Sequence, residues 1–430
     1  MKNRPTFQTL AASSQAGDAL SVALVGYGRR GEELLDALTR MDGVHIAAVA
    51  DIWPWRRDMA RDRMRARKRD IRVYETLGEL LAEEGERVDA VIVATPDWLH
   101  ANHVTDCLTA GKHVYCEGEL ASTVEGARGL VRLAREKQLL IQGGHQRRSN
   151  PRYIHAFERV CREHQALGRV THAYAQWHRG LEPLRVMPQR LALSAETLTC
   201  YGYDGMEPFL NWEWHRRYGL GDAAARLGQK LDLLRWFWNA EVVSVSALAG
   251  YDVLNRDTPD SLMAMFTFRD QNREIHRGYV QVLSSSNRGG EFEAFGGEGV
   301  TSLACSENPV ADNIISVRCT CCDSCTKYLI HRELGSHLKK GLFTFERISL
   351  LKREEMWREQ KPQVRIQFPV RLDKPVVQPH LENFMVAIRG EAALADPPEQ
   401  AFANLVAVEG AMRSAATMSP VDFTARDFEI

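Results

Sequence analysis

Three glycines spaced as G-x-G-x-x-G could bind an anionic phosphate group. Gly26, Gly28 and Gly31 follow the apolar run SVALVG and open EELLDALTRM, whose apolar residues have helical spacing. Strand, glycine turn and helix in this order are typical of a turn that binds a dinucleotide pyrophosphate at the helix N-terminus. Gly26 permits the tight turn, Gly28 lets the pyrophosphate approach the backbone, and Gly31 lets the helix pack on the strand. Arg29 and Arg30 lie inside the same turn and are expected at the cofactor.

A carboxylate follows at the expected distance along the chain. A second predicted strand, VHIAAVAD, ends in Asp51, where a carboxylate can accept hydrogen bonds from the adenosine ribose hydroxyls. Asp51 would repel a 2′-phosphate, so NAD is favoured over NADP. The arginine-rich segment 55–70 leaves NADP open as the lesser alternative, because Arg56 or Arg57 could reach a 2′-phosphate.

Strands and helices continue to alternate after this unit. The predicted strands are VDAVIVATP, KHVYCE and LLIQGG, and the predicted helices between them are DWLHANHVTDCLTAG and STVEGARGLVRLAREKQ. This alternation predicts a doubly wound parallel sheet, whose ligands bind at the carboxyl ends of the strands. The other residues expected at the cofactor lie at or near these ends: Thr95, Pro96, Asp97, His100, Glu117, Gly118 and Gln146.

Three stretches carry a resemblance to a known family. They are VDAVIVATPDWLHANHVTDCLTAGKHVYCEGELASTVEGARGLVRLA, GHQRRSNPRY and QPHLENFMVAIRG, and they strongly resemble the glucose–fructose oxidoreductase/inositol dehydrogenase (Gfo/Idh/MocA) family. The resemblance spans about residues 20–430. It implies an α/β fold, with an N-terminal Rossmann domain and a C-terminal α/β domain whose sheet is open and mostly antiparallel.

Sequence and resemblance together predict the domain organisation. A chain of 430 residues is longer than one hydrophobic core usually spans. We expect a disordered lead-in at 1–20, a dinucleotide-binding domain at 21–147, and a substrate and oligomerisation domain at 148–430. By resemblance, the helices within 379–417 return to pack beside the Rossmann domain.

The resemblance also implies two catalytic groups that this chain lacks. The lysine that follows GKHVYCE in the family is replaced by Gly118, which offers neither charge nor proton. The histidine of the second family signature falls on Gln229, within YGLGDAAARLGQKLDLLRWFW. Gln229 can form hydrogen bonds but cannot exchange a proton usefully. The candidates for a catalytic role are therefore His145, Gln229, Lys230 and His178, each with a structural role as the alternative.

Three functions stay open on this basis. The first is an NAD-dependent oxidoreductase acting on a sugar, cyclitol or glycoside with a relocated acid/base. The second is a non-catalytic NAD-binding subunit on an enzyme fold, and the third is an NAD-dependent glycoside-cleaving enzyme. The expected partner is a carbohydrate-like small molecule, together with a second copy of the chain (dimer or tetramer) or another subunit.

Composition excludes several other classes. A formal net charge of −1 gives no reason to expect nucleic acid, and no apolar run is long enough to span a bilayer. Nine cysteines, an odd number, argue against a disulfide framework, and the N-terminus lacks an apolar export segment, so a cytoplasmic location is expected. Cys319, Cys321, Cys322 and Cys325 have spacing that could bind zinc, but a reduced cluster is favoured.

Overall fold

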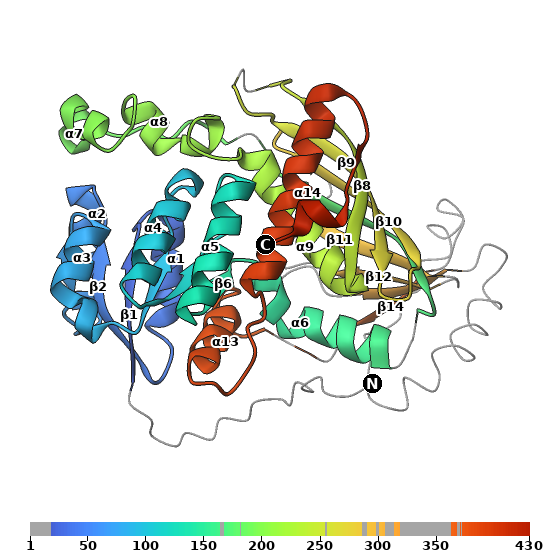
Figure 1. The fold of residues 1–430 in the computed structure, drawn as a ribbon, viewed down its shortest axis with the longest axis horizontal. Coiled ribbons are helices and arrows are strands. Elements are labelled where there is room, and N and C mark those ends of the chain that lie inside the picture. Colours follow the sequence, from blue (N-terminus) through green and yellow to red (C-terminus); the bar gives the residue numbers. More distant parts are fainter. Residues whose placement is uncertain are drawn as a thin grey trace, which may run out of the picture.

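The computed structural model describes residues 19–163, 167–180, 182–253, 256–285, 290–297, 301–305, 314–318, 363–367, 370 and 372–430. They form two β-sheets, one of six strands and one of nine, with helices around both (Figure 1). The α/β fold with a Rossmann sheet and a second, mostly antiparallel sheet is therefore confirmed. Residues 1–18 and the cysteines at 319–325 lie outside the described residues, so the predictions made for them stay predictions.

All strands of the first sheet run parallel, in the order β3-β2-β1-β4-β5-β6. Its elements are β1 (Leu20–Val25), α1 (Arg29–Leu38), β2 (Val44–Ala50), α2 (Pro54–Ala66), β3 (Arg72–Tyr74), α3 (Leu77–Glu84), β4 (Ala90–Val93), α4 (Asp97–Thr109), β5 (His113–Cys116), α5 (Val124–Lys137) and β6 (Ile141–Gly143). The strand order reverses between β1 and β4. In open parallel sheets, ligands bind beyond the carboxyl ends of the strands at this point.

Continuous apolar runs build this sheet because helices cover both of its faces. Successive residues of β1 point to opposite faces, so Ala23 joins one core cluster while Val22 and Leu24 join another. All of β4 is buried as well. The strands are thus held rigidly, and the loops at their carboxyl ends start from fixed positions.

The second sheet has the order β14-β13-β12-β11-β7-β10-β9-β8-β15. Its strands are β7 (Val170–His178), β8 (Ala240–Gly250), β9 (Ser261–Asp270), β10 (Ile275–Leu283), β11 (Glu291–Gly297), β12 (Thr301–Cys305), β13 (Ile314–Arg318), β14 (Gln363–Gln367) and β15 (Val421–Asp422). Strands β7 and β10 pair in parallel, and the other described pairs are antiparallel.

Short helical elements connect the two sheets. They are the 3₁₀ turn η2 (Gln146–Ser149), α6 (Pro151–Ile154) and a π-helix (His155–Glu163). Between β7 and β8 of the second sheet lie α7 (Ala195–Cys200), α8 (Met206–Leu210) and the longer α9 (Asp222–Trp238). Helix α9 packs against the second sheet through Leu227, Leu231 and Leu234, which are fully buried. In the described part of the chain, no helix is both long and apolar enough to cross a membrane.

Two helices from the C-terminal part of the sequence return to the first sheet. Helix α13 (Gln378–Ile388) buries Leu381 and Phe384 in the same core cluster as β1, and α14 (Pro398–Thr417) buries Phe402 and Leu405 in the cluster on the other face. Figure 1 shows α14 between α5 and the second sheet, which it also contacts through β8. The Rossmann core is therefore completed by residues far along the chain.

Residues 182–218, which we call the roof segment, contain α7 and α8 and lie above the helices of the Rossmann domain (Figure 1). The segment is attached by side-chain contacts. Trp53 Nε1 donates to the Leu191 carbonyl at 2.8 Å, and the Tyr201 hydroxyl donates to Glu75 Oε1 at 2.6 Å. The ring of Trp98 meets that of Tyr203 edge-on, with the ring centres 5.5 Å apart. The roof segment is thus packed on the first domain although it belongs to the chain of the second.

Candidate functional site

A cavity of about 580 Å³ lies between the carboxyl ends of β1, β2 and β4 and the roof segment. This volume is within the range of about 300–1,000 Å³ that is usual for small-molecule sites. Seven of the residues predicted to bind cofactor line it: Gly26, Gly28, Arg29, Arg30, Asp51, Thr95 and Pro96. The structure therefore brings the glycine turn and the predicted ribose-binding carboxylate together in one cavity.

The glycine turn has the geometry that close approach requires. Gly26 has φ +89°, and a Cβ there would lie 2.7 Å from the Ala94 carbonyl oxygen. A Cβ on Gly31 would lie 2.0 Å from the Gly26 carbonyl oxygen, so helix α1 could not pack on this turn with any larger residue. Gly28, by contrast, has no atom within 4 Å of an added Cβ, and as N-cap of α1 it supplies no capping side chain. The first N–H groups of α1 are left available to an anion.

Asp51 is held in place by two backbone donors. Its Oδ2 accepts from Tyr27 N at 2.7 Å, and its Oδ1 accepts from Trp53 N at 2.8 Å. Burial raises the pKa of the Asp51 carboxyl, while these two hydrogen bonds favour the charged form and oppose the rise. Each carboxylate oxygen keeps acceptor capacity toward the cavity, which suits a pair of ribose hydroxyls.

The wall opposite the glycine turn is aromatic and cationic. Its members are Trp177 and Arg179 from the end of β7, and Arg185, Tyr201, Tyr203, Phe209, Leu210, Trp212 and Glu213 from the roof segment. Burial lowers the pKa of Arg179, and the nearby cations Arg226, Arg29 and Arg185 lower it further. Both arginines also have acidic partners, since Arg185 pairs with Glu213 at 2.5 Å and Arg179 pairs with Glu182.

The side chain of Arg30 extends from the glycine turn toward the carboxyl ends of β5 and β6 in the same sheet. Its Nε lies 3.0 Å from Glu117 Oε1, and its Nη2 donates to Gln146 Oε1 at 2.7 Å. Glu117 follows β5 and Gln146 follows β6, so these contacts pass over the end of β4. Glu117, Gly118 and Gln146 do not line the cavity.

Two further residues predicted to bind cofactor have structural contacts instead. Both ring nitrogens of His100 lie against backbone carbonyls, at 2.8 Å from Glu119 O and 2.7 Å from Thr95 O. Burial disfavours the charged ring, but Cys116, Asp97 and the Glu119 carbonyl raise the pKa of His100 to about 10. Asp97 accepts from Leu220 N, and burial raises its pKa. Neither residue lines the cavity.

Gly118, where the resemblance predicts a lysine, has a backbone that disfavours any side chain. Its φ is +67°, in the left-handed region that L-residues seldom adopt. No atom lies within 4 Å of a Cβ added there, so space is not the obstacle. A lysine at this position would therefore be strained by the backbone and not by its neighbours.

The candidates on α9 are held by neighbouring ion pairs. Gln229 Oε1 accepts from Arg147 Nη1 at 3.1 Å. Lys230 is fully buried, where its ammonium pairs with Glu291 at 2.8 Å and with Glu293. Neither Gln229 nor Lys230 lines the cavity. At the end of β7, Trp177 and Arg179 line the cavity, whereas His178 between them does not.

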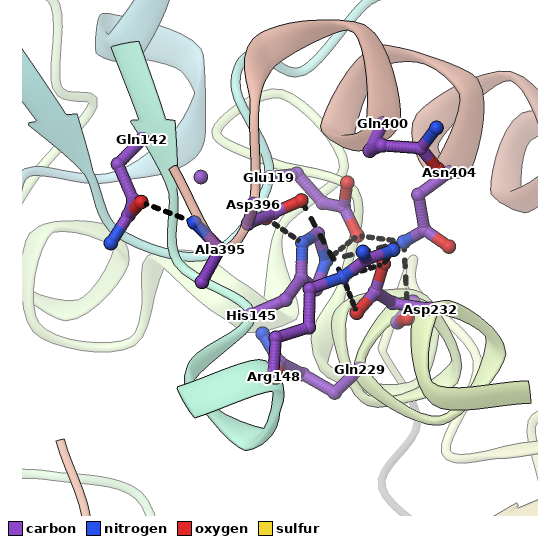
Figure 2. Close-up of polar contacts among 12 residues, drawn as sticks. Glu119, Gln142, His145, Arg148, Gln229, Asp232, Ala395, Asp396, Gln400 and Asn404 are labelled. Atoms are coloured by element: carbon purple, nitrogen blue, oxygen red, sulfur yellow. Dashed lines mark hydrogen bonds and ion pairs between the residues drawn. The ribbon is translucent and has the colours of Figure 1, made fainter. Parts of the chain in front are cut away.

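His145 lies at the centre of a buried polar network, shown in Figure 2. Its Nδ1 is 2.6 Å from Asp396 Oδ2 and its Nε2 is 3.4 Å from Glu119 Oε1. Asn404 donates to Glu119 Oε1 at 3.1 Å and to the Gly228 carbonyl at 3.0 Å. Asn404 Nδ2 also lies 3.2 Å from His145 Nε2, but the carboxylates that face the two ring nitrogens favour the imidazolium form.

The charges around His145 explain its protonation. Burial lowers the pKa of His145, but Asp232, Asp396 and the hydrogen bonds with Asp396 and Glu119 outweigh burial and raise it well above its usual value. Arg148 forms a bidentate pair with Asp232, with Nε–Oδ2 and Nη2–Oδ1 distances of 2.8 and 2.7 Å. The ligand atoms of His145, Asp232 and Asp396 lie within 4.8 Å of one another, as in a metal site, but Arg148 already supplies a cation there.

Residues 20–145 match the family model described as an oxidoreductase family with an NAD-binding Rossmann fold (GFO_IDH_MocA). Over these residues the chain is similar to the Gfo/Idh/MocA family. Its similarity to individual members is partial. It is 36% identical over 138 residues to the 4-carboxy-2-hydroxymuconate-6-semialdehyde dehydrogenase of Sphingobium sp., covering 32% of this chain and 42% of that protein. It is 28% identical over 238 residues to an inositol 2-dehydrogenase of Rubrobacter xylanophilus, covering 54% and 63%.

The family fold extends over nearly the whole chain. An NAD-binding protein from Listeria innocua superposes with a TM-score of 0.66 at 18% identity, covering 94% of this chain and 97% of that one. At this identity the likeness shows the fold alone. The chain spans less than two thirds of the length of both curated relatives named above, so their activities are not transferred by similarity.

Sequence reasoning missed one wall of the site. The alternation along β7 does place Trp177 and Arg179 on one face, but it does not reveal that this face borders the cavity. Arg185 carried no local signal, because it lies in the roof segment, which joins the cavity only through packing on the first domain.

Proposed function

We propose that the cavity binds NAD and that the protein is an NAD-dependent oxidoreductase acting on a carbohydrate-like hydroxyl or carbonyl group. The observation that carries the proposal is the meeting of an open glycine turn and an anchored Asp51 on one wall of a cavity at the point where the strand order reverses. The family description and the inositol dehydrogenase relative support the reaction class.

Different residues would bind different parts of NAD. The free N–H groups at the start of α1 would hold the pyrophosphate next to Gly28, and Asp51 would accept from the adenosine ribose. Thr95 and Pro96 border the same space, and Tyr201 in the roof segment covers it. When bound, NAD supplies the group that accepts or donates a hydride.

The proton that accompanies hydride transfer needs a partner on this chain. Gly118 cannot supply one, so His145, Lys230, His178 and, as a hydrogen-bonding group, Gln229 remain our proposed candidates. None of the four borders the cavity, which favours a second candidate function, an NAD-binding subunit that transfers no hydride on its own.

Calorimetry of NAD binding tests the cofactor site. Asp51→Ala should weaken NAD⁺ binding by about tenfold or more, because two ribose hydroxyls lose a charged acceptor. Asp58→Ala, an exposed aspartate on α2, is the matched control and should leave the affinity unchanged. Equal affinities of wild type and Asp51→Ala would reject the proposed site.

Activity then separates the two candidate functions. NADH formation with a panel of cyclitols and sugars, including myo-inositol, supports the oxidoreductase. Tight NAD binding without NADH formation in the isolated protein, with activity appearing only beside a second protein, supports the binding subunit. Hydrolysis of an activated glycoside without net NADH would replace both with the glycoside-cleaving alternative.

We also propose that the protein self-associates through its second sheet. Leu248 and Met265 remain 60% and 62% exposed on β8 and β9, and Met263, which pairs with Leu248 in the register, is 38% exposed. Apolar side chains gathered on an open sheet are more common at interfaces than on monomer surfaces. The expected partner is a second copy of this chain.

A further inference from the structure

Arg30 lines the edge of the cavity, and its side chain extends from there to residues that the cavity does not reach. The cavity covers the ends of β1, β2 and β4, but the residues that follow β5 and β6, Glu117 and Gln146, lie outside it. The guanidinium of Arg30 is bound to both of them, at 3.0 and 2.7 Å. Tyr115 holds Glu117 from behind with a hydroxyl donated to Oε2 at 3.1 Å.

The position of this contact matters because of how a dinucleotide lies on such a sheet. Its two halves rest on either side of the point where the strand order reverses, here between β1 and β4. Asp51, after β2, marks the adenosine side. The remaining half must therefore extend over β4, β5 and β6, which is the region that Arg30 crosses.

We propose that Arg30 is a specificity-determining gate, whose bonds to Glu117 and Gln146 close the nicotinamide side of the cofactor site. With Arg30 in this position, the cavity accepts the ADP-ribose part of a ligand without any rearrangement. A ligand that carries a nicotinamide ring must first release Arg30 from the two acceptors. This inference rests on the proposed NAD site and adds that the site distinguishes ADP-ribose from NAD⁺.

The surroundings of Arg30 allow such a release. Its Nη1 also donates to Glu33 Oε2 at 2.9 Å, and Glu33 lies one turn further along the same helix. Because both residues belong to α1, this bond can persist when the side chain leaves Glu117. Burial lowers the pKa of Arg30, but Glu117 and Glu33 raise it above its usual value, so the group stays charged in either position.

The free energy needed to release Arg30 determines how strongly the site should favour ADP-ribose over NAD⁺. Opening breaks the ion pair with Glu117 and the hydrogen bond that the charged guanidinium donates to the Gln146 amide oxygen, in a site that is mostly shielded from water. The loss of one charged hydrogen bond of this kind corresponds to a change of about ten- to a hundredfold in a binding constant. Wild type should therefore bind ADP-ribose at least about tenfold more tightly than NAD⁺.

The test is calorimetric binding of ADP-ribose and NAD⁺ to wild type and Arg30→Met. Removing the guanidinium should raise the affinity for NAD⁺ relative to that for ADP-ribose by about tenfold. Glu117→Gln weakens the same contact from the other side and should shift the ratio of the two affinities in the same direction. Arg29→Met is the matched control, because Arg29 lines the cavity beside the glycine turn and should affect both ligands equally.

The outcomes separate this inference from the proposal on which it rests. Equal affinities of wild type for the two ligands would overturn the gate, while leaving the cofactor site intact. Weaker NAD⁺ binding in Arg30→Met, with ADP-ribose unchanged, would also overturn it, since Arg30 would then hold the nicotinamide half. If neither ligand binds any of the proteins, the cofactor site itself is rejected, and the gate with it.

Discussion

Replacing His145 with glutamine should change how stability depends on pH. In the native state, His145 lies between Asp396 and Glu119, with Asp232 and Arg148 close by, and its pKa is well above the usual value. In the unfolded chain, a histidine has a pKa of about 6.5. A group whose pKa is higher in the folded state contributes stability that is complete below the unfolded value. That contribution is lost as pH rises toward the native pKa.

The size of the effect follows from this difference. Each pH unit between the two pKa values removes about 1.4 kcal/mol from the contribution of His145 to the free energy of unfolding. At pH 6, His145→Gln leaves Glu119 buried without its cation and leaves Asp396 with only Arg148, 3.7 Å away, a change that costs up to about 3–5 kcal/mol. As pH rises above 6.5, the gap between wild type and variant should shrink by up to about 1.4 kcal/mol per pH unit until the pH reaches the native pKa of His145.

Urea denaturation followed by tryptophan fluorescence, repeated at intervals from pH 6 to 8.5, measures this gap directly. His172→Gln is the control, because His172 is exposed on β7 and its loss should give a small, pH-independent difference. A gap between wild type and His145→Gln that stays constant over this range, or widens with pH, would refute the assignment of His145 as a buried cation.

Three further changes test other parts of the structure. Asp232→Asn breaks the bidentate pair with buried Arg148 and should lower the free energy of unfolding by about 3–5 kcal/mol in denaturant titrations; a loss no larger than that of the exposed Asp58→Asn would contradict this. Gly118→Lys places a side chain at φ +67° and should lower the free energy of unfolding by about 1–2 kcal/mol in the same titrations, whereas an unchanged stability would show that the loop adapts. Met265→Glu places a charge on the open sheet and should reduce the mass measured by light scattering to that of a single chain, while an unchanged mass would place the interface elsewhere.

The cofactor half of the site was accessible to sequence reasoning because its signals are local. The glycine turn, the strand before it and the carboxylate after the next strand follow one another within about one β-α-β unit, and backbone geometry then dictates where each lies. Gly26, Gly28 and Asp51 accordingly line one cavity. The parallel sheet follows from the same alternation of strands and helices.

The surroundings of Arg30 and His145 could not be predicted in this way, because they depend on contacts between distant parts of the chain. Arg30 is part of the glycine motif, but its partners Glu117 and Gln146 are reached only after the sheet has formed. The position of His145 at a strand end made it a candidate acid/base. The carboxylate that faces its Nδ1, Asp396, comes from a loop before α14, far along the chain. Spacing within a sequence identifies which groups are titratable, but it does not reveal which charges will face them.

The return of α13 and α14 to the first sheet has a consequence for how the protein is made. Phe384 and Phe402 complete the cores on opposite faces of a sheet whose strands emerge from the ribosome hundreds of residues earlier. During synthesis, domains generally fold as units in order of appearance. This Rossmann sheet must instead wait, with apolar surface exposed, until residues beyond 400 are available. We expect nascent chains and truncated fragments that stop near residue 150 to depend on chaperones or to aggregate. A minimal cofactor-binding version of the protein would need the two late helices joined to the early strands.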